Sequence, residues 1–178
     1  MVYHERRLPH WQVIGQPLFV TFRLHDSLPA SRIFLPENLS SGRAFVAMDL
    51  LLDHPQSGPV HLSLPEIARM VVDSIRDGEA RFGRYELHAF VVMPNHVHML
   101  ITPRTVSKHW LGPLKGFTGL TANRMLGRSG PFWQDESYDR LVRDSNEFSR
   151  ISAYIADNPV RAGLALDPER YPWSGGGL

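Results

Sequence analysis

The run Phe90–Thr102 constrains the fold of this chain more than any other segment, because it sets two histidines in an apolar stretch. One residue separates His96 from His98, and apolar residues precede, separate and follow them. Side chains alternate between the faces of a strand, so both imidazoles share one face while Val97 and Met99 take the other. Two neutral imidazoles on one face form half of a metal site. A hydrogen-bonded pair in a half-buried sheet is the alternative interpretation.

The size and composition of the chain are those of one globular domain. Its 178 residues are 43% hydrophobic and 21% charged, which suits a soluble protein with a proper core. No apolar run approaches the length of a membrane-spanning helix, and residues 1–7 lack the apolar stretch of a secretory signal. The absence of cysteine excludes disulfides, thiolate nucleophiles and cysteine-ligated zinc. We therefore expect a single domain over residues 1–178, located in the cytoplasm and without a membrane partner.

Hydrophobic periodicity predicts four strands. They are expected at Gln16–Leu24, Arg84–Val92, His96–Thr102 and Phe132–Val142. The connection Met93-Pro-Asn95 is short enough to join the second and third strands as an antiparallel hairpin.

Helical segments are expected between these strands. Ser63–Glu66 matches a capping box, and the helix that it starts should run to about Ala80. Pro113 suits the first turn of another helix that reaches Gly127. Residues 28–62, which are rich in proline and glycine, are expected to form a helical insertion after the first strand.

A last helix should follow the fourth strand. Asp144–Glu147 offers good N-cap residues, and Pro159 disfavours helical geometry at the residue before it, so the helix should end by Asn158. Residues 161–178 form a tail, in which Tyr171–Ser174 is expected to pack back on the body. The order βαββαβ predicts a ferredoxin-like α+β fold with a four-stranded antiparallel sheet and an appended C-terminal helix.

Tyr154 and Asn158 form a second candidate constellation. They lie four residues apart on the last predicted helix, so both project from one helical face. With His96 and His98, the Asn158 carbonyl would give a shell of two nitrogens and one oxygen that suits Mg²⁺ or Mn²⁺ and leaves room for a phosphodiester. A metal there would polarise the phosphoryl group and favour an ionised phenol as nucleophile. In the alternative interpretation, Tyr154 borders a buried helical stripe and Asn158 marks a helix end.

The segment 104–134 is basic and aromatic. It has no acidic residue and contains Arg104, Lys108, Lys115, Arg124 and Arg128, interleaved with Trp110, Phe117, Phe132 and Trp133. Such a stretch in a nearly neutral protein is typical of a nucleic-acid contact. We take Lys115, Arg124, Arg128 and Arg143 as candidate DNA contacts, and Trp133 as a base-stacking platform. The solvated face of an ordinary amphipathic helix is the alternative.

The motifs around these residues resemble those of the HUH single-tyrosine transposases, above all the branch of REP-associated tyrosine transposases. The likeness runs in the family's order through Val20–Arg23, Leu64–Ala68, Tyr85–Val92, Met93–Ile101, Leu114–Phe117 with Asn123, Phe132–Gln134, Tyr138–Arg140 with Arg143, Tyr154-Ile, and Asn158–Gly163.

The resemblance implies that His96 and His98 bind a divalent metal, Mg²⁺ or Mn²⁺, that Asn158 completes its shell and that Tyr154 is the nucleophile. It implies an endonuclease and strand transferase that cleaves single-stranded DNA beside a hairpin. The tyrosine would become joined to the 5′-phosphate and leave a free 3′-OH, without ATP. The resemblance is compatible with a homodimer.

Other interpretations stay open at this point. Tyr138 is a rival nucleophile, disfavoured because a strand position has no matching ligand one helical turn away. The chain is also compatible with a nucleic-acid-binding module that keeps the fold without the chemistry. A zinc-type hydrolase that uses His96 and His98 with Asp139 would release its product without a covalent protein–DNA species.

Overall fold

The computed structural model describes residues 2–5, 9–28, 52 and 58–176. Most of the predicted helical insertion over residues 28–62 therefore lies outside the described residues. At the N-terminus, β1 (Val2–Glu5) and β2 (Pro9–Gln12) form an antiparallel pair that the sequence analysis did not predict.

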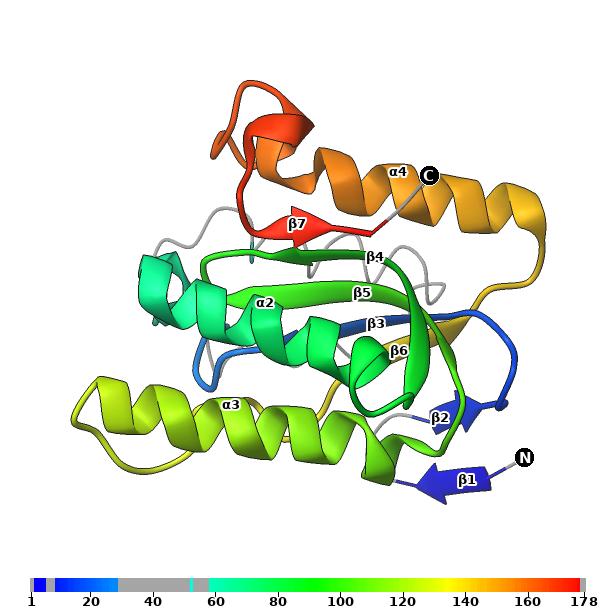
Figure 1. Ribbon diagram of the computed structural model, residues 1–178, viewed down its shortest axis with the longest axis horizontal. Helices are drawn as coiled ribbons and strands as arrows, with labels where there is room; N and C mark the ends of the chain where they lie inside the picture. The colour runs from blue at the N-terminus through cyan, green and yellow to red at the C-terminus, as the bar shows by residue number, and fades with distance from the viewer. Residues whose placement is uncertain (1, 6–8, 29–51, 53–57, 177–178) are drawn as a thin grey trace.

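A five-stranded antiparallel sheet forms the centre of the molecule (Figure 1). Its strands, in spatial order, are β6 (Tyr138–Leu141), β3 (Leu18–Arg23), β5 (His96–Pro103), β4 (Tyr85–Val92) and β7 (Ser174–Gly175). The α+β class and the antiparallel sheet are confirmed. The prediction of four strands is wrong, because the C-terminal tail adds β7 beside β4. The ferredoxin-like arrangement stays a prediction.

Helices cover both faces of this sheet (Figure 1). α2 (Pro65–Ala80) and α3 (Leu111–Met125) pack on one face, which we call the core face, and α4 (Ser145–Arg161) packs on the other, the α4 face. Short 3₁₀ turns lie at His61–Ser63, Ser107–His109 and Pro168–Arg170. None of the helices in the described part of the chain is long and apolar enough to cross a membrane.

Alternation along β5 decides which face the two histidines take. Val97 and Met99 belong to the apolar cluster between the sheet and the α2–α3 pair, whereas Leu100 belongs to the cluster under α4. Because strand side chains alternate, His96 and His98 project from the same face as Leu100. The two imidazoles thus share one face, as predicted, and α4 covers that face.

The predicted capping box at Ser63–Glu66 is wrong. The Ser63 hydroxyl donates to the Val60 carbonyl at 2.7 Å, and the N-cap is Leu64, whose side chain caps nothing. α2 begins at Pro65, where the missing N–H costs little because first-turn N–H groups have no partner within a helix. The predicted end near Ala80 is confirmed.

α4 confirms one expectation and overturns another. Asp144 is the N-cap, and its carboxylate accepts a bond of 2.8 Å from the Glu147 N–H. The predicted end by Asn158 is wrong, because α4 continues through Pro159 to Arg161. Proline removes one intrahelical N–H donor. So close to the helix end that loss is confined to the last turn, which the Ala162 N–H closes by donating to Asn158 at 3.0 Å.

The C-terminal tail is built into the sheet rather than only packed against it. The Tyr171 hydroxyl donates to the Val92 carbonyl at 2.8 Å, and the Val92 N–H donates to the Trp173 carbonyl at 2.8 Å. Gly176 has φ +73°, and a Cβ there would lie 2.8 Å from the His88 carbonyl oxygen, so this close approach requires glycine. The predicted packing of Tyr171–Ser174 on the body is confirmed.

The last predicted strand is much shorter than expected. Phe132–Val142 was expected to be extended throughout, but β6 covers Tyr138–Leu141, preceded by an isolated bridge between Leu24 and Trp133.

Candidate active site

The imidazoles of His96 and His98 meet on the α4 face. Their Nε2 atoms are 3.1 Å apart, and both side chains are fully buried. The other ring nitrogen of each is held by a neighbour. Asn95 Oδ1 lies 2.7 Å from His96 Nδ1, and Thr21 Oγ1 lies 2.7 Å from His98 Nδ1. Thr21 is brought there because β3 pairs with β5 in a register that sets Thr21 opposite His98.

α4 brings the phenol of Tyr154 to this pair. The ring centroids of Tyr154 and His98 are 5.8 Å apart, in an edge-on arrangement. Phe19 of β3 contacts both, with centroid distances of 5.5 Å to His98 and 6.4 Å to Tyr154. The Arg161 guanidinium lies over the phenol ring, 4.8 Å from its centroid, in a cation–π contact. Tyr154 is therefore half-buried and fixed beside the histidines.

Asn158 lies one helical turn after Tyr154 and is fully buried. Residues four apart on a helix share a face, and Ile155 of the same helix packs into the apolar cluster of the α4 face. The side of α4 that carries Asn158 is therefore turned into the protein rather than to solvent. Asn158 therefore faces the interior of the protein, as its predicted role as a metal ligand requires.

Tyr138, the rival nucleophile, lies on the same face. It sits opposite Thr21 in the β3–β6 register, and its ring is 6.4 Å from that of Phe19. Burial raises the pKa of the Tyr138 phenol, which makes its ionised form harder to reach. The ring of Tyr154, by contrast, lies edge-on to that of His98, with 5.8 Å between the centroids. The geometry favours Tyr154.

Asp139 projects from the core face. It pairs with Val20, which belongs to the apolar cluster under α2 and α3. Residues directly opposite in a ladder share a face, so Asp139 points away from His96 and His98. Within the described ranges no group of three histidine, cysteine, aspartate or glutamate residues could hold a metal. The zinc-hydrolase interpretation thereby loses its third ligand.

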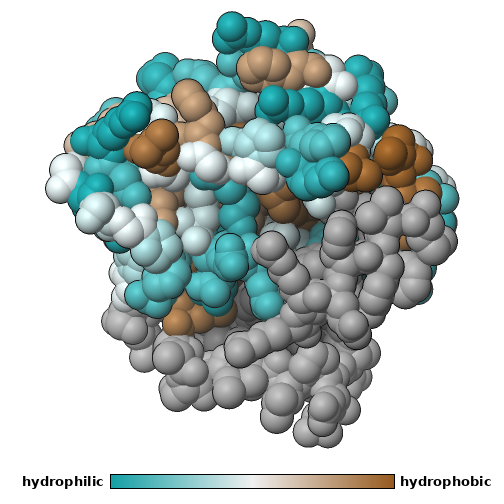
Figure 2. Space-filling model, turned by 90° about the horizontal axis from the view of Figure 1, so that it is seen from below, coloured by the Kyte–Doolittle hydropathy of each residue, from teal (hydrophilic) through white to brown (hydrophobic). Residues whose placement is uncertain are grey.

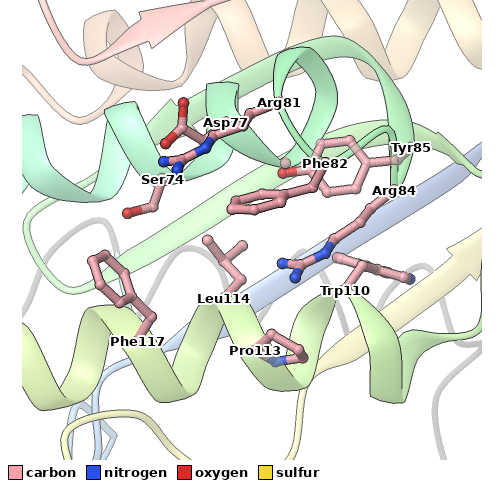
Figure 3. A pocket seen from close by; sticks show the side chains of 11 residues that line it. Ser74, Asp77, Arg81, Phe82, Arg84, Tyr85, Trp110, Pro113, Leu114 and Phe117 are labelled. Carbon is pink, nitrogen blue, oxygen red and sulfur yellow. The ribbon is translucent and has the colours of Figure 1, made fainter.

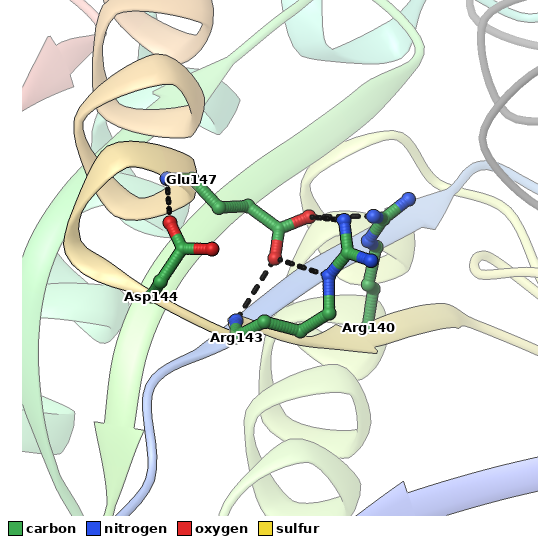
Figure 4. A network of polar contacts seen from close by, with 4 residues as sticks. All are labelled: Arg140, Arg143, Asp144 and Glu147. Atoms are coloured by element: carbon green, nitrogen blue, oxygen red, sulfur yellow. Dashed lines mark hydrogen bonds and ion pairs between the residues drawn. The ribbon is translucent and has the colours of Figure 1, made fainter.

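A polar network fixes the start of α4 to the sheet (Figure 4). The buried Glu147 carboxylate accepts from the Arg140 guanidinium at 2.5 Å and from Arg143 Nε at 3.0 Å. The hydrogen bond from Arg143 is the main cause that lowers the pKa of Glu147 to about 2, with the positive charge of Arg140 adding to it. Arg143, a predicted DNA contact, is 70% exposed and held in one orientation.

The other predicted DNA contacts lie away from the histidines. Lys115 Nζ donates to the carbonyls of Gln134 at 2.7 Å and Asp135 at 2.8 Å, which ties α3 to the segment after it. Arg124 and Arg128 are exposed at the end of α3, on the core-face side of the sheet. The structure does not bring these three residues together with His96, His98 and Tyr154.

The structure places Trp133 in the core rather than at the surface. It is 7% exposed, its ring meets that of Phe22 at 4.8 Å, and its N–H donates to Thr118 at 2.9 Å. In this arrangement the predicted stacking of Trp133 on a base is not available. Exposed aromatic and aliphatic side chains do occur on α3, at Phe117, Leu120 and Met125. Figure 2, seen from the α3 side, shows such residues scattered among hydrophilic ones.

A pocket of about 270 Å³ lies between α2 and α3 (Figure 3). Phe82, stacked against the Arg84 guanidinium at 4.4 Å, and Phe117 belong to its walls. The pocket contains none of the predicted site residues, and the sheet separates it from the histidine pair.

Sequence reasoning missed the partners of the two imidazoles. Asn95 carries a weak signal, because it directly precedes His96. Thr21 carries none, since its place depends on the pairing of two strands that are 77 residues apart. The contact of Arg161 with Tyr154 also went unpredicted, because the helix was expected to end before it.

Taken together, the site is a buried histidine pair on a central strand, faced by a tyrosine from the helix that packs on this face of the sheet. A curated protein similar to this chain is the REP-associated tyrosine transposase of Escherichia coli (strain K12), with 26% identity over 94 residues. The match covers 51% of this chain and 53% of that protein, so the chain spans about half the length of the curated relative. No family model matches the chain.

A solved structure with a similar fold is that of a REP-associated tyrosine transposase bound to a REP hairpin. It aligns with a TM-score of 0.56 at 18% identity, over 96% of this chain and 81% of that one. At this identity the likeness shows the fold alone. The curated relative carries the name of the family that the motifs resemble, and the structural neighbour has the same fold as this chain.

Proposed function

We propose that this protein is a metal-dependent endonuclease and strand transferase of the transposase type, which acts on single-stranded DNA beside hairpins. One observation carries the proposal. The phenol of Tyr154 lies edge-on to His98, 5.8 Å between ring centroids, and His98 in turn faces His96 with 3.1 Å between the Nε2 atoms. A phenol and a pair of imidazole nitrogens are thus adjacent.

The histidine pair fits a divalent cation. Two nitrogens that each lie about 2.1 Å from one metal at a right angle are about 3 Å apart, close to the distance observed here. His96 and His98 would hold the metal, with the Asn158 amide oxygen as third ligand, and the mixed nitrogen and oxygen set suits Mn²⁺ or Mg²⁺. The bound cation would polarise a phosphoryl oxygen of the substrate.

Tyr154 supplies the nucleophile. Its phenol oxygen attacks the phosphorus of a phosphodiester, an oxygen–phosphorus bond forms, and the bond from phosphorus to the 3′ oxygen breaks. The phenol loses its proton, and the 3′ oxygen gains one and leaves as a free 3′-OH. Because the 5′-phosphotyrosine keeps a phosphoester linkage, the 3′-OH of this or another strand can reverse the step without ATP. Phe19 and Arg161, which flank the phenol, hold it in place.

DNA with a hairpin is the proposed substrate, supported by the hairpin bound to the structural neighbour. Arg143 is the strongest candidate phosphate contact, because it lies at the start of the same helix as Tyr154 and is both exposed and oriented. Arg124 and Arg128 would contact duplex or flanking strand on the core-face side. We expect the protein to act in the cytoplasm, and a homodimer stays a prediction.

A 5′-tailed hairpin oligonucleotide incubated with the protein and Mn²⁺ tests the proposal. The expected product is a covalent protein–DNA adduct that survives denaturing electrophoresis and is lost in Tyr154→Phe. Tyr138→Phe is the matched control, since it removes the other phenol oxygen from the same face, and it should keep the adduct. Tight binding without cleavage would favour the DNA-binding module, and cleavage without an adduct would favour a hydrolase.

A further inference from the structure

A chain of hydrogen-bonding contacts runs through the histidine pair. It begins at the Leu52 carbonyl, which accepts from Asn95 Nδ2 at 3.0 Å. Asn95 Oδ1 then meets His96 Nδ1 at 2.7 Å, the two Nε2 atoms meet at 3.1 Å, and His98 Nδ1 meets Thr21 Oγ1 at 2.7 Å. All five residues are buried, so water does not substitute for any of these partners without a rearrangement.

Leu52 fixes the tautomer of His96. A carbonyl only accepts, so the Asn95 atom that faces it is the amide nitrogen, and the atom that faces His96 is the amide oxygen. That oxygen accepts, so His96 carries its proton on Nδ1. The lone pair of its Nε2 therefore points toward His98. This orientation is the one a metal ligand needs.

The direction of these hydrogen bonds then determines the tautomer of His98 when no cation is bound. Two Nε2 lone pairs 3.1 Å apart repel each other, whereas an Nε2–H on His98 donates to the Nε2 of His96. His98 Nδ1 is then unprotonated and accepts from the Thr21 hydroxyl. Each group in the series then donates one hydrogen bond to the next. The series runs from Thr21 through both rings to Asn95 and the Leu52 carbonyl.

A cation demands the other tautomer of His98. Both Nε2 atoms must then offer a lone pair, so the proton of His98 has to lie on Nδ1. Among uncharged side chains near in size to threonine, a hydroxyl is suited to this change because it either donates or accepts by rotating about one bond. His98 neither gains nor loses a net proton, since one leaves Nε2 and one arrives at Nδ1.

We propose that Asn95 and Thr21 are positioning residues with different tasks. Asn95 holds His96 permanently in the ligand tautomer, and Thr21 lets His98 change tautomer when a divalent cation binds. The inference rests on the metal site of the proposed function, but its first half concerns the protein without metal and is testable there.

Nitrogen-15 NMR of histidine-labelled protein reads the tautomers directly. Without metal, His96 should be protonated on Nδ1 and His98 on Nε2. With Zn²⁺ added as a diamagnetic probe, His98 should change to Nδ1–H while His96 stays as it was. The proposal is overturned if His96 carries its proton on Nε2, or if His98 has the same tautomer with and without bound Zn²⁺.

Thr21→Val tests the task of the hydroxyl with almost no change of shape. We expect Mn²⁺ affinity, measured by calorimetry, to fall roughly 10- to 100-fold, as for other partners that orient a ligand. Thr21→Ser should restore it to near wild type. Thr118→Val is the matched control, because Thr118 is equally buried and hydrogen-bonded but lies on the core face, and it should leave Mn²⁺ affinity unchanged.

The two proposals fail in distinguishable ways. If the wild type binds Mn²⁺ and His96→Ala does not, but Thr21→Val binds as well as wild type, the inference about Thr21 is wrong while the metal site stands. If the wild type binds no divalent cation, the metal site of the proposed function is wrong. The metal-free tautomers would in that case still decide whether Asn95 orients His96.

Discussion

The two faces of the central sheet differ in what they bury. On the core face, β5 contributes Val97 and Met99 to an apolar cluster closed by α2 and α3. On the α4 face, the same strand contributes His96 and His98, and β3 adds Thr21. Because its side chains alternate between faces, β5 contributes to the apolar core on one face and to the candidate site on the other.

Stability and the proposed chemistry should therefore depend on different faces of the sheet. Buried apolar side chains on the core face stabilise the fold without directional requirements. The imidazoles of His96 and His98 and the Thr21 hydroxyl cost free energy to bury and are tolerated because each has a hydrogen-bonding partner. We therefore expect substitutions on the core face to lower stability and those on the α4 face to remove binding and catalysis.

The sharpest contrast is expected at His98. His98→Ala removes one of the two facing nitrogens, so Mn²⁺ affinity should fall by more than about 100-fold, beyond what the loss of an orienting partner causes. Calorimetric titration with Mn²⁺ measures it. His88→Ala is the control, because His88 lies on β4 and bonds to Thr102 away from the pair. Unchanged affinity in His98→Ala would break the contrast between the faces.

Met99 follows His98 in β5 but lies on the core face. Its substitution should lower stability and leave metal binding unchanged. Met99→Ala leaves a cavity in the core face, so the free energy of unfolding should fall by about 2 to 5 kcal/mol while Mn²⁺ binding of the folded protein is kept. Urea titration measures the stability. The exposed Met125→Ala provides the comparison and should stay within about 0.5 kcal/mol of wild type. A loss of metal binding without a loss of stability in Met99→Ala would contradict the assignment of faces.

Glu147 refines the comparison between the two faces of the sheet, because it is a buried charge on the α4 side. Its hydrogen bond from Arg143 lowers its pKa from 4.5 to about 2. A lowered folded pKa stabilises the protein above about pH 4.5, and this contribution is lost as the pH falls toward 2. Because Arg143 is exposed, its contribution is discounted for solvent screening. We expect the Glu147 charge to add about 1 to 3 kcal/mol to the free energy of unfolding at neutral pH.

Urea titrations of the wild type and Glu147→Gln from pH 7 to pH 2 measure this contribution. The stability difference between the two proteins should shrink as the pH falls through this range. A difference that stays constant with pH would show that the Glu147 charge does not stabilise α4.

The smallest effect is expected for a substitution of Arg128 on DNA binding. It tests whether DNA contacts the core-face side of the protein. If Arg128 contacts one phosphate, Arg128→Gln should weaken binding similarly for all sequences and reduce the slope of log affinity against log salt by about 1. Fluorescence anisotropy with a hairpin at several salt concentrations measures this slope. Arg150→Gln, an exposed arginine on α4, is the comparison. An unchanged slope in Arg128→Gln would confine DNA binding to other surfaces.

Local patterns foretold much of this fold. The alternation in Phe90–Thr102 is a property of adjacent residues, so the hairpin and the shared face of the two histidines could be predicted. The N-cap at Asp144 and the helical spacing of Tyr154 and Asn158 are local in the same sense. These features needed no knowledge of what lies across the sheet.

Features that depend on distant contacts escaped prediction. β7 forms from a glycine-rich tail with little strand preference, because the edge of β4 offers bonding groups to it. α4 passes through Pro159 where local rules place an end. The partner of His98 is Thr21, which only the register between β3 and β5 reveals. Trp133 was expected at the surface from its basic neighbours, but it fills the core.

Mass-spectrometric mapping of the residue that becomes joined to DNA tests the central claim most directly. The protein would be incubated with Mn²⁺ and a 5′-tailed hairpin, digested with protease and nuclease, and searched for peptides that carry a nucleotide. The account predicts a 5′-phosphate linkage on the α4 peptide at Tyr154. A linkage at Tyr138, or efficient cleavage with no linked peptide, would contradict it.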